Sequence, residues 1–309
     1  MGGLLWIGSA VADVVVRVPR LPVTGDDLHV LEQHVNLGGC ACNAFLTARR
    51  AGSVRCDLFA PVGGGLWGDW VRGALEARGV KTLAPPVHDA NGCCYCLVEE
   101  DGERTFLCQH GAEYRFCSAW FDRVSMRDYD AVYLCGLEVE EPAGDALLDA
   151  LEHDPPRCLY FAPGPRLCRI PPRRMARVMA MHPILHLGDS EAEAFTRQHT
   201  PAEAAALLHE LTGSDVVITM GAQGAYVLSD EYAGVVPGCI ARVVDTIGAG
   251  DSHIGALMAA RAEGMSIRQA VRYANHVAAA VVGVSGVELK DEAWCELRRI
   301  KEEIGHEQH

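Results

Sequence analysis

The stretch VVDTIGAGDSHIGALMAA (residues 243–260) places a glycine-rich turn between two carboxylates, Asp245 and Asp251. The small and apolar residues that follow predict a helix that starts near residue 250 and runs through Arg261. Glycines let the backbone turn tightly, and the first N–H groups of a helix lack internal partners at the positive end of its dipole. Such a turn is an anion site, and phosphate is its natural occupant. The candidate anion hole is the backbone of Gly248, Ala249 and Gly250.

A carboxylate beside a phosphate repels it, so the position of Asp251 needs a reason. Phosphoryl transfer to an alcohol supplies one, because a carboxylate orients the hydroxyl and takes its proton while N–H donors stabilise the transferring group. The alternative is that Asp251 only complements the start of the helix and Asp245 caps a strand. This segment alone leaves both interpretations open.

The composition limits the possible partners. The chain has 309 residues and a net charge of −14, and its densest basic run, RIPPRRMAR at 169–177, is typical of a solvated loop and helix start. We therefore expect no nucleic-acid partner. No apolar run approaches the ~18 residues of a membrane span, and the apolar N-terminus lacks a basic region and is interrupted by Asp13. We expect a cytoplasmic protein with no membrane partner.

Thirteen scattered cysteines are typical of buried thiols in a reducing compartment. CCYC at 93–96 lacks the second ligand pair of a zinc site. VGGGLWGDW at 62–70 contains G-x-G-x-x-G between a strand and a helix, the context of a dinucleotide fold. Asp89 lies about 20 residues on but follows a poor second strand, so an NAD-dependent oxidoreductase is a weak alternative. No Walker A motif occurs.

Short β-branched runs alternate with helical patterns along the chain. This alternation predicts one α/β domain over 1–309, a mostly parallel central sheet with helices on both faces. The predicted strands are 4–11, 55–62, 130–137, 158–164, 183–188, 215–221 and 224–229. The predicted helices are 42–52, 67–80, 141–153, 190–198 and 201–213.

Two stretches, 14–35 and 93–111, are predicted hairpins, the second turning at Asp101-Gly102. Together they predict a small β-sheet lid over a site at the carboxyl edge of the main sheet. A thin sheet cannot bury two apolar faces on its own domain, so we expect a homodimer joined through the lids. The alternative is a solvated outer face. The apolar residues at alternating positions are Val14, Val16 and Val18, with Cys94, Cys96 and Val98.

The motif DTIGAGDSHIGA closely resembles the C-terminal signature of the ribokinase-like carbohydrate kinases, the PfkB family. Further similar motifs follow one another in the family's order: GSAVADVVVRVPRLP, NLGGCACNAFLTARRAG, DGERTF, ITMGAQGAYVL and AVRYANHVAAAVV. The series covers nearly the whole chain and is nearest to a branch of uncharacterised bacterial sugar kinases. The resemblance implies the ribokinase-like fold with its β-lid, and Asp251 as the general base.

The resemblance also implies the binding residues. Those for the sugar are Asp13, Gly38, Gly39 and Asn43, with Glu138 a weaker candidate that a solvated loop acid explains equally well. Those for the nucleotide are Thr219, Gly221, Gly224, Gly250 and Asn275. Glu191 would hold Mg²⁺ through water, and Asp245 would help to hold a monovalent cation such as K⁺.

The chain departs from the family pattern at several of these positions. Gly188 stands where the family often has the Asn of N-x-x-E, so the amide side chain that helps to organise magnesium is missing, although Asp189 could substitute. Cys40 stands where ribokinases carry Lys, and His253 where Phe is usual, so ribose specificity does not carry over. Gly65 replaces the family's usual Asp.

These observations predict an ATP- and Mg²⁺-dependent kinase that phosphorylates a hydroxyl group of a sugar or sugar-like molecule. A nucleoside kinase is the first alternative, because Phe106, Trp67 or Tyr95 could provide a platform for a base. A non-catalytic sugar- or nucleotide-binding protein on the same fold is the second, motivated by Gly188.

Overall fold

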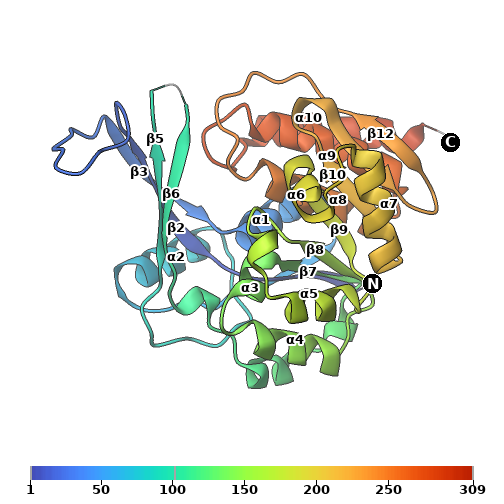
Figure 1. The fold of residues 1–309 in the computed structure, drawn as a ribbon, viewed down its shortest axis with the longest axis horizontal. Helices are drawn as coiled ribbons and strands as arrows, with labels where there is room; N and C mark the ends of the chain where they lie inside the picture. Colours follow the sequence, from blue (N-terminus) through green and yellow to red (C-terminus); the bar gives the residue numbers. More distant parts are fainter. Residues whose placement is uncertain (1, 101, 308–309) are drawn as a thin grey trace.

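The computed structural model describes residues 2–100 and 102–307, so the predicted turn residue Asp101 lies outside the described residues. In that part of the chain eight strands form a central sheet in the order β12-β11-β10-β9-β8-β7-β1-β4 (Figure 1). Its strands are β1 (Gly3–Ile7), β4 (Arg55–Phe59), β7 (Ala131–Cys135), β8 (Leu159–Ala162), β9 (Ile184–Gly188), β10 (Val216–Thr219), β11 (Gly224–Leu228) and β12 (Ala233–Pro237).

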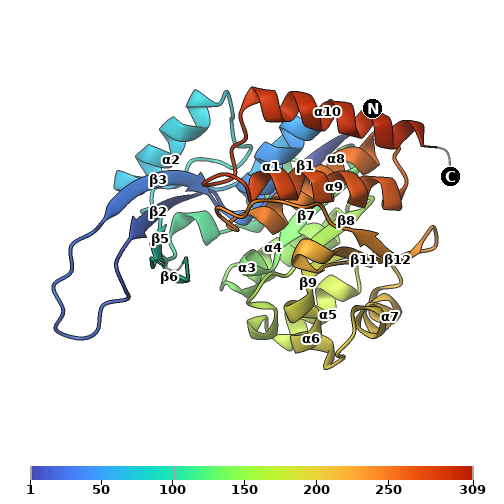
Figure 2. The ribbon, with the colours of Figure 1, turned by 90° about the horizontal axis from the view of Figure 1, so that it is seen from above.

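Helices cover both faces of this sheet, as the alternating pattern predicts (Figure 2). In this sheet order, the neighbouring strands β4, β1, β7, β8, β9 and β10 pair in parallel. Strands β11 and β12 add to the β10 edge in antiparallel pairing. One apolar cluster lies under α1, α8, α9 and α10, and a second lies under α4 to α7. The helices are α1 (Cys40–Ala51), α2 (Gly65–Ala77), α3 (Gly136–Glu140), α4 (Gly144–His153), α5 (Pro172–Met179), α6 (Asp189–Thr196), α7 (Pro201–Thr212), α8 (Ala249–Ala262), α9 (Ile267–Val281) and α10 (Asp291–His306).

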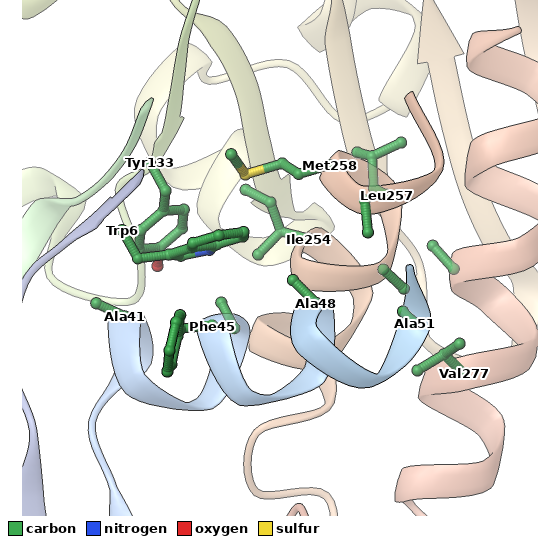
Figure 3. Packing of buried hydrophobic residues seen from close by; sticks show 14 of the residues in the cluster. Trp6, Ala41, Phe45, Ala48, Ala51, Tyr133, Ile254, Leu257, Met258 and Val277 are labelled. Atoms are coloured by element: carbon green, nitrogen blue, oxygen red, sulfur yellow. The ribbon is translucent and has the colours of Figure 1, made fainter. Parts of the chain in front are cut away.

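Helices α1 and α8 pack at backbone contact distance. A Cβ atom added at Gly255 would lie 2.3 Å from the carbonyl oxygen of Ala44, so only glycine fits there. Figure 3 shows Trp6 and Tyr133 of the sheet packed between Phe45 of α1 and Ile254 of α8, with the alanines of α1 along the helix contact. This contact fixes the start of α8, and therefore Asp251, against the start of α1.

The lid is a separate four-stranded sheet of order β3-β2-β5-β6, standing to one side of the main body in both views (Figures 1 and 2). Strands β2 (Val11–Arg17) and β5 (Cys93–Val98) pair in parallel and join the two hairpins, whose outer strands are β3 (Glu32–Gly38) and β6 (Arg104–Gln109). Val14 and Val16 pack on Trp67 of α2, which covers part of the outer face.

Several predicted boundaries are wrong. The predicted strand 4–11 is two strands, because the chain leaves the central sheet after Ile7 and enters the lid at Val11. The predicted strand 130–137 ends at Cys135, where α3 begins. The first hairpin spans residues 11–38 rather than 14–35. Strand β12 and helix α10 are not among the predicted elements, although Trp294, Leu297 and Ile304 of α10 share one buried face.

Two motifs have structural explanations. In the glycine run, a Cβ atom at Gly68 would lie 2.2 Å from the oxygen of Gly63, so these glycines permit close packing at the start of α2. In the basic run, Arg177 of α5 forms ion pairs with acidic residues of α4, and Arg174 pairs with Asp145. Two of the four arginines of the run are thus paired with acidic residues of α4, while Arg169 and Arg173 are exposed.

Within residues 2–100 and 102–307, no helix is both long and apolar enough to span a membrane. The same residues contain no cluster of three or more His, Cys, Asp or Glu side chains suited to a metal ion. The cysteines of CCYC lie on strand β5 of the lid.

A buried hydrogen-bonded relay connects β9, α8 and α9. The Nε2 atom of His186 lies 2.8 Å from Nδ1 of His253, whose Nε2 lies 3.1 Å from Oδ1 of Asn275. The amide nitrogen of Asn275 donates to the carbonyl oxygens of Val236 and Pro237. Asn275 Oδ1 is therefore an acceptor, which places a proton on Nε2 of both histidines. The relay holds Asn275 in place at one wall of a cavity described below.

We predict that this relay makes the fold sensitive to acid. Burial lowers the pKa of His186 and lowers the pKa of His253 to about 4, so the unfolded chain binds more protons below the ordinary histidine pKa near 6.5. The stability that the neutral pair contributes is complete above that pH and is lost as the pH falls. The loss approaches about 1.4 kcal/mol per pH unit for each proton.

Urea unfolding between pH 7 and pH 5 measures this effect. The double variant His186→Leu/His253→Phe should lose less stability over that interval than the native chain. The control is His199→Gln, because His199 is exposed. Parallel stability curves for the native chain and the double variant would contradict the prediction.

Candidate active site

The predicted substrate residues meet where the chain leaves the carboxyl ends of β1 and β7. Asp13 lies on β2 of the lid, and the Gly38–Gly39 pair immediately precedes α1. Asn43 lies on the first turn of α1 and Glu138 on α3. Ligands of open parallel sheets bind at this edge of the strands.

Asp251 and Asn43 are in direct contact although 208 residues separate them along the chain. The amide nitrogen of Asn43 donates to Oδ2 of Asp251 at 3.0 Å. Burial raises the pKa of Asp251 to about 6, and hydrogen bonds from Asn43 and Cys40 offset part of that rise. A carboxylate with a pKa near the working pH suits a general base.

Two glycines make room for Asp13. A Cβ atom at Gly38 would lie 1.8 Å from Oδ2 of Asp13, so any side chain at 38 would displace that carboxylate. Gly39 has a φ of 97°, and a Cβ atom there would lie 2.5 Å from the oxygen of Ser9. Burial, followed by the negative charges of Asp251 and Cys108, raises the pKa of Asp13 to about 7.

Glu138 is fully buried, so its interpretation as a solvated loop acid is wrong. Its position follows from α3, which begins directly after β7 and turns the side chain inward. The N–H of Ser9 donates to Oε1 at 2.9 Å, and Oε2 has no partner among the described residues. Burial raises the pKa of Glu138 to about 7. The unpartnered oxygen fits a substrate hydroxyl.

The start of α8 forms the expected turn. Gly248 has a φ of 70°, and a Cβ atom there would lie 2.1 Å from a methyl group of Val287, so glycine is required. The N–H groups of Gly250 and Asp251 have no backbone acceptor within the described part of the chain. The N–H of Ala249, a predicted donor of the anion hole, is not free, because it donates to the oxygen of Thr246 at 3.3 Å. Gly250 and Asp251 therefore supply the free donors.

The structure brings the predicted nucleotide residues together around one cavity of about 280 Å³. This cavity lies between the β10–β11 turn, the segment before α8, and α9, and it opens beside the start of α8. Its remaining walls are largely apolar, from residues such as Val243, Ala278 and Val282. The nucleotide residues that line it are Thr219, Gly221, Gly224, Gly250 and Asn275.

Arg104 is a site residue that the sequence reasoning did not identify. It extends from the lid strand β6, with Nη2 at 2.9 Å from Oδ1 of Asp245 and Nη1 at 2.7 Å from Oγ1 of Thr246. Asp245 also accepts the N–H groups of Ile247 and Gly286. Asp245 therefore fixes the turn before α8 and connects it to the lid. Its role in binding a monovalent cation stays a prediction.

After burial, the negative charge of Glu191 is a smaller cause of the raised pKa of Asp251. Oε2 of Glu191 accepts the N–H of Gly188 at 2.9 Å, which leaves the second carboxylate oxygen available. Mg²⁺ keeps several waters and is held by one or two carboxylates plus phosphates. The donor set fits Mg²⁺ bound in that way, and this role of Glu191 stays a prediction.

Comparison with known proteins agrees with this geometry. The profile of the pfkB family carbohydrate kinases matches residues 1–294. The chain is 34% identical to the uncharacterised sugar kinase YegV of Escherichia coli over 287 residues, 92% of this chain and 89% of that protein.

Two solved structures share the fold. The ribokinase of Arabidopsis thaliana complexed with ribose and ATP superposes with a TM-score of 0.77 at 21% identity, covering 96% of this chain and 98% of that one. The adenosine kinase of Sinorhizobium meliloti superposes with a TM-score of 0.82 at 20% identity, covering 96% and 99%. The fold is therefore ribokinase-like, and because the family profile matches residues 1–294, the chain belongs to the pfkB family of carbohydrate kinases.

Proposed function

We propose that this protein transfers the γ-phosphoryl group of ATP to a hydroxyl group of a sugar or sugar-like molecule, with Asp251 as the general base. The observation that carries the proposal is the position of Asp251. It lies beside the unpaired N–H groups at the start of α8, between the nucleotide cavity and the carboxylates of the partly buried Asp13 and the fully buried Glu138.

The chemistry follows from these groups. The acceptor hydroxyl donates a hydrogen bond to Asp251 and gives it the proton as the new O–P bond forms. Asn43 holds Asp251 in position for that contact. The N–H groups of Gly250 and Asp251 stabilise negative charge on the transferring group. Bound Mg²⁺ would neutralise charge on the ATP phosphates.

A nucleoside is the alternative acceptor. The strand pairing in the lid indicates which of the three predicted aromatic residues could stack on its base. Paired residues of a sheet share a face, and alternate residues along a strand face opposite sides. Phe106 pairs with Cys96, which pairs with Val15, so it shares the inner face with Asp13 and is half exposed. Tyr95 and Trp67 belong to the outer side. Phe106 is the remaining platform.

The third candidate, a non-catalytic binding protein, has less support. It is motivated by Gly188, which removes the amide side chain of the family motif. Asp251 nevertheless keeps a raised pKa and a hydrogen bond from Asn43, features that suit proton transfer rather than binding alone.

We expect Asp251→Asn to lower kcat by about 10²–10⁴-fold, because the variant cannot accept the proton. Nucleotide affinity should remain near that of the native protein. With a pKa raised to about 6, native kcat/KM should fall as the pH drops through 6, because protonated Asp251 is no base. Asp69→Asn changes a surface ion pair and is the control. Near-native turnover by Asp251→Asn would refute this role.

A panel of free sugars and nucleosides, assayed by ADP release, identifies the acceptor class. We expect a free sugar to be phosphorylated, and Phe106→Ala to leave its KM within about twofold, since stacking on a base is absent. If only nucleosides react, and Phe106→Ala raises their KM, the protein is a nucleoside kinase. Binding without product across the panel would favour the non-catalytic candidate.

We also propose that two copies associate through their lids. The outer face of the lid exposes Tyr95 and Leu107, whereas α2 covers the part around Val14, Val16 and Val18. Light scattering should give about twice the monomer mass of 33.3 kDa. Leu107→Glu should produce monomers, whereas Leu211→Glu, at an exposed position on α7, should not. A native monomer at micromolar concentration would exclude this dimer.

A further inference from the structure

A row of polar side chains crosses the inner face of the lid at the level of Asp13. The strand registers pair Asn36 of β3 with Asp13 of β2, Asp13 with Cys94 of β5, and Cys94 with Cys108 of β6. Residues paired in this way share one face of a sheet. The row therefore ends in two thiols next to Asp13, which is predicted to bind the sugar. Their sulfur atoms lie 3.2 Å apart.

Cys108 is both accessible and activated. It is exposed, and Cys94 is partly exposed, so small oxidants can reach both. The pKa of Cys108 is lowered to about 5, because Cys94 donates an S–H bond to its sulfur and His110 lies beside it. The pKa of His110 is raised, chiefly by its hydrogen bond with Cys108 and further by Glu141, whose Oε1 lies 2.5 Å from Nδ1 of the ring. A thiolate is the reactive form of cysteine.

The other two cysteines of β5 lack these properties. Cys93 and Cys96 are buried, and burial raises the pKa of each thiol. Buried thiols of raised pKa are inert structural residues. This contrast distinguishes the Cys94–Cys108 pair from the buried cysteines beside it on β5.

The backbone is suited to a bond between the two sulfurs. Directly opposite residues of an antiparallel pair have Cα atoms about 4.5–5.5 Å apart. Disulfides span Cα separations of about 4.4–6.8 Å, with the sulfurs at about 2.05 Å. The sulfurs of Cys94 and Cys108 therefore need to approach from 3.2 Å by side-chain rotation, with the strand pairing retained.

We propose that Cys94 and Cys108 are a redox modification site on the sugar-facing surface of the lid, which hydrogen peroxide converts to a disulfide. The Cys108 thiolate attacks one peroxide oxygen, forming a sulfenic acid and releasing hydroxide, which takes up a proton. The Cys94 sulfur then attacks the sulfenic sulfur, the S–S bond forms, and water leaves. In total two thiols lose two hydrogen atoms, and one peroxide is reduced to two waters.

The modification alters the surroundings of Asp13. It removes the negative charge of Cys108, one of the causes that raise the pKa of Asp13, and it ties β5 to β6. It also removes a thiol that can hydrogen-bond a sugar hydroxyl. The kinetic consequence rests on the proposed function: the KM of the acceptor sugar should rise about 2- to 10-fold, the effect of one hydrogen bond.

Peptide mass spectrometry tests the bond itself, without any assay of activity. Trypsin cleaves after Arg104, so the two cysteines fall in different peptides that a disulfide would join. Stoichiometric peroxide should produce that joined peptide and remove two titratable thiols, and dithiothreitol should reverse both changes. Cys94→Ser and Cys108→Ser should each abolish the joined peptide, whereas Cys295→Ser, at an exposed cysteine of α10, should not.

Two results would overturn the site: oxidation of Cys108 beyond sulfenic acid with no joined peptide, or joining that survives Cys94→Ser. The kinetic arm is separate and uses whichever acceptor the panel identifies. An oxidised protein with an unchanged acceptor KM would overturn the coupling to the sugar site. Absence of phosphorylation altogether would count against the proposed function while the peptide result still decides the disulfide.

Discussion

The backbone contact between α1 and α8 is the constraint on which the site depends. With no side chain at Gly255, the two helices approach until their backbones touch at Ala44. Asn43, one residue before Ala44, thereby reaches Asp251 from a point 208 residues earlier in the chain. Interiors packed this closely transmit small changes in volume to their surroundings. A wider helix separation would move Asp251 away from its amide partner even if both helices stayed intact.

The electrostatics of the site follow from several carboxyl groups that are largely shielded from solvent. Asp13, Glu138 and Asp251 all have pKa values raised chiefly by burial, and for Asp13 the neighbouring negative charges add to that effect. Hydrogen bonds from Asn43 and Ser9 offset only part of the rise. Such a group of carboxyls favours a neutral ligand rich in O–H donors over an anionic one, because each hydroxyl can donate to a buried oxygen. The positive end of α8 and its free N–H groups, in contrast, suit an anion such as the phosphate of the proposed reaction.

The lid makes different contacts on its two faces, because successive side chains of a strand point to opposite faces of the sheet. Its outer face rests partly on Trp67, which gives this small sheet a core of its own. Its inner face carries Asp13 and the Cys94–Cys108 pair, on the side of the proposed sugar site. Arg104 ties the same sheet to Asp245 and Thr246 at the turn before α8. Asp13, the predicted ligand of the acceptor, and the contact with the turn before α8 thus belong to one element.

The sequence by itself determined the features that depend on local spacing. The glycine turn and Asp251 before a helix, the α/β alternation and the two hairpins follow from residues a few positions apart, and the ordered motifs indicated the family. Tertiary structure alone decided which distant side chains meet. Burial of Glu138, the pairing of Asp245 with Arg104, the His186–His253–Asn275 relay and the contact of Cys94 with Cys108 depend on strand register and helix packing. The break between β1 and β2 was hidden for the same reason, because a continuous apolar run does not record where a chain passes from one sheet to another.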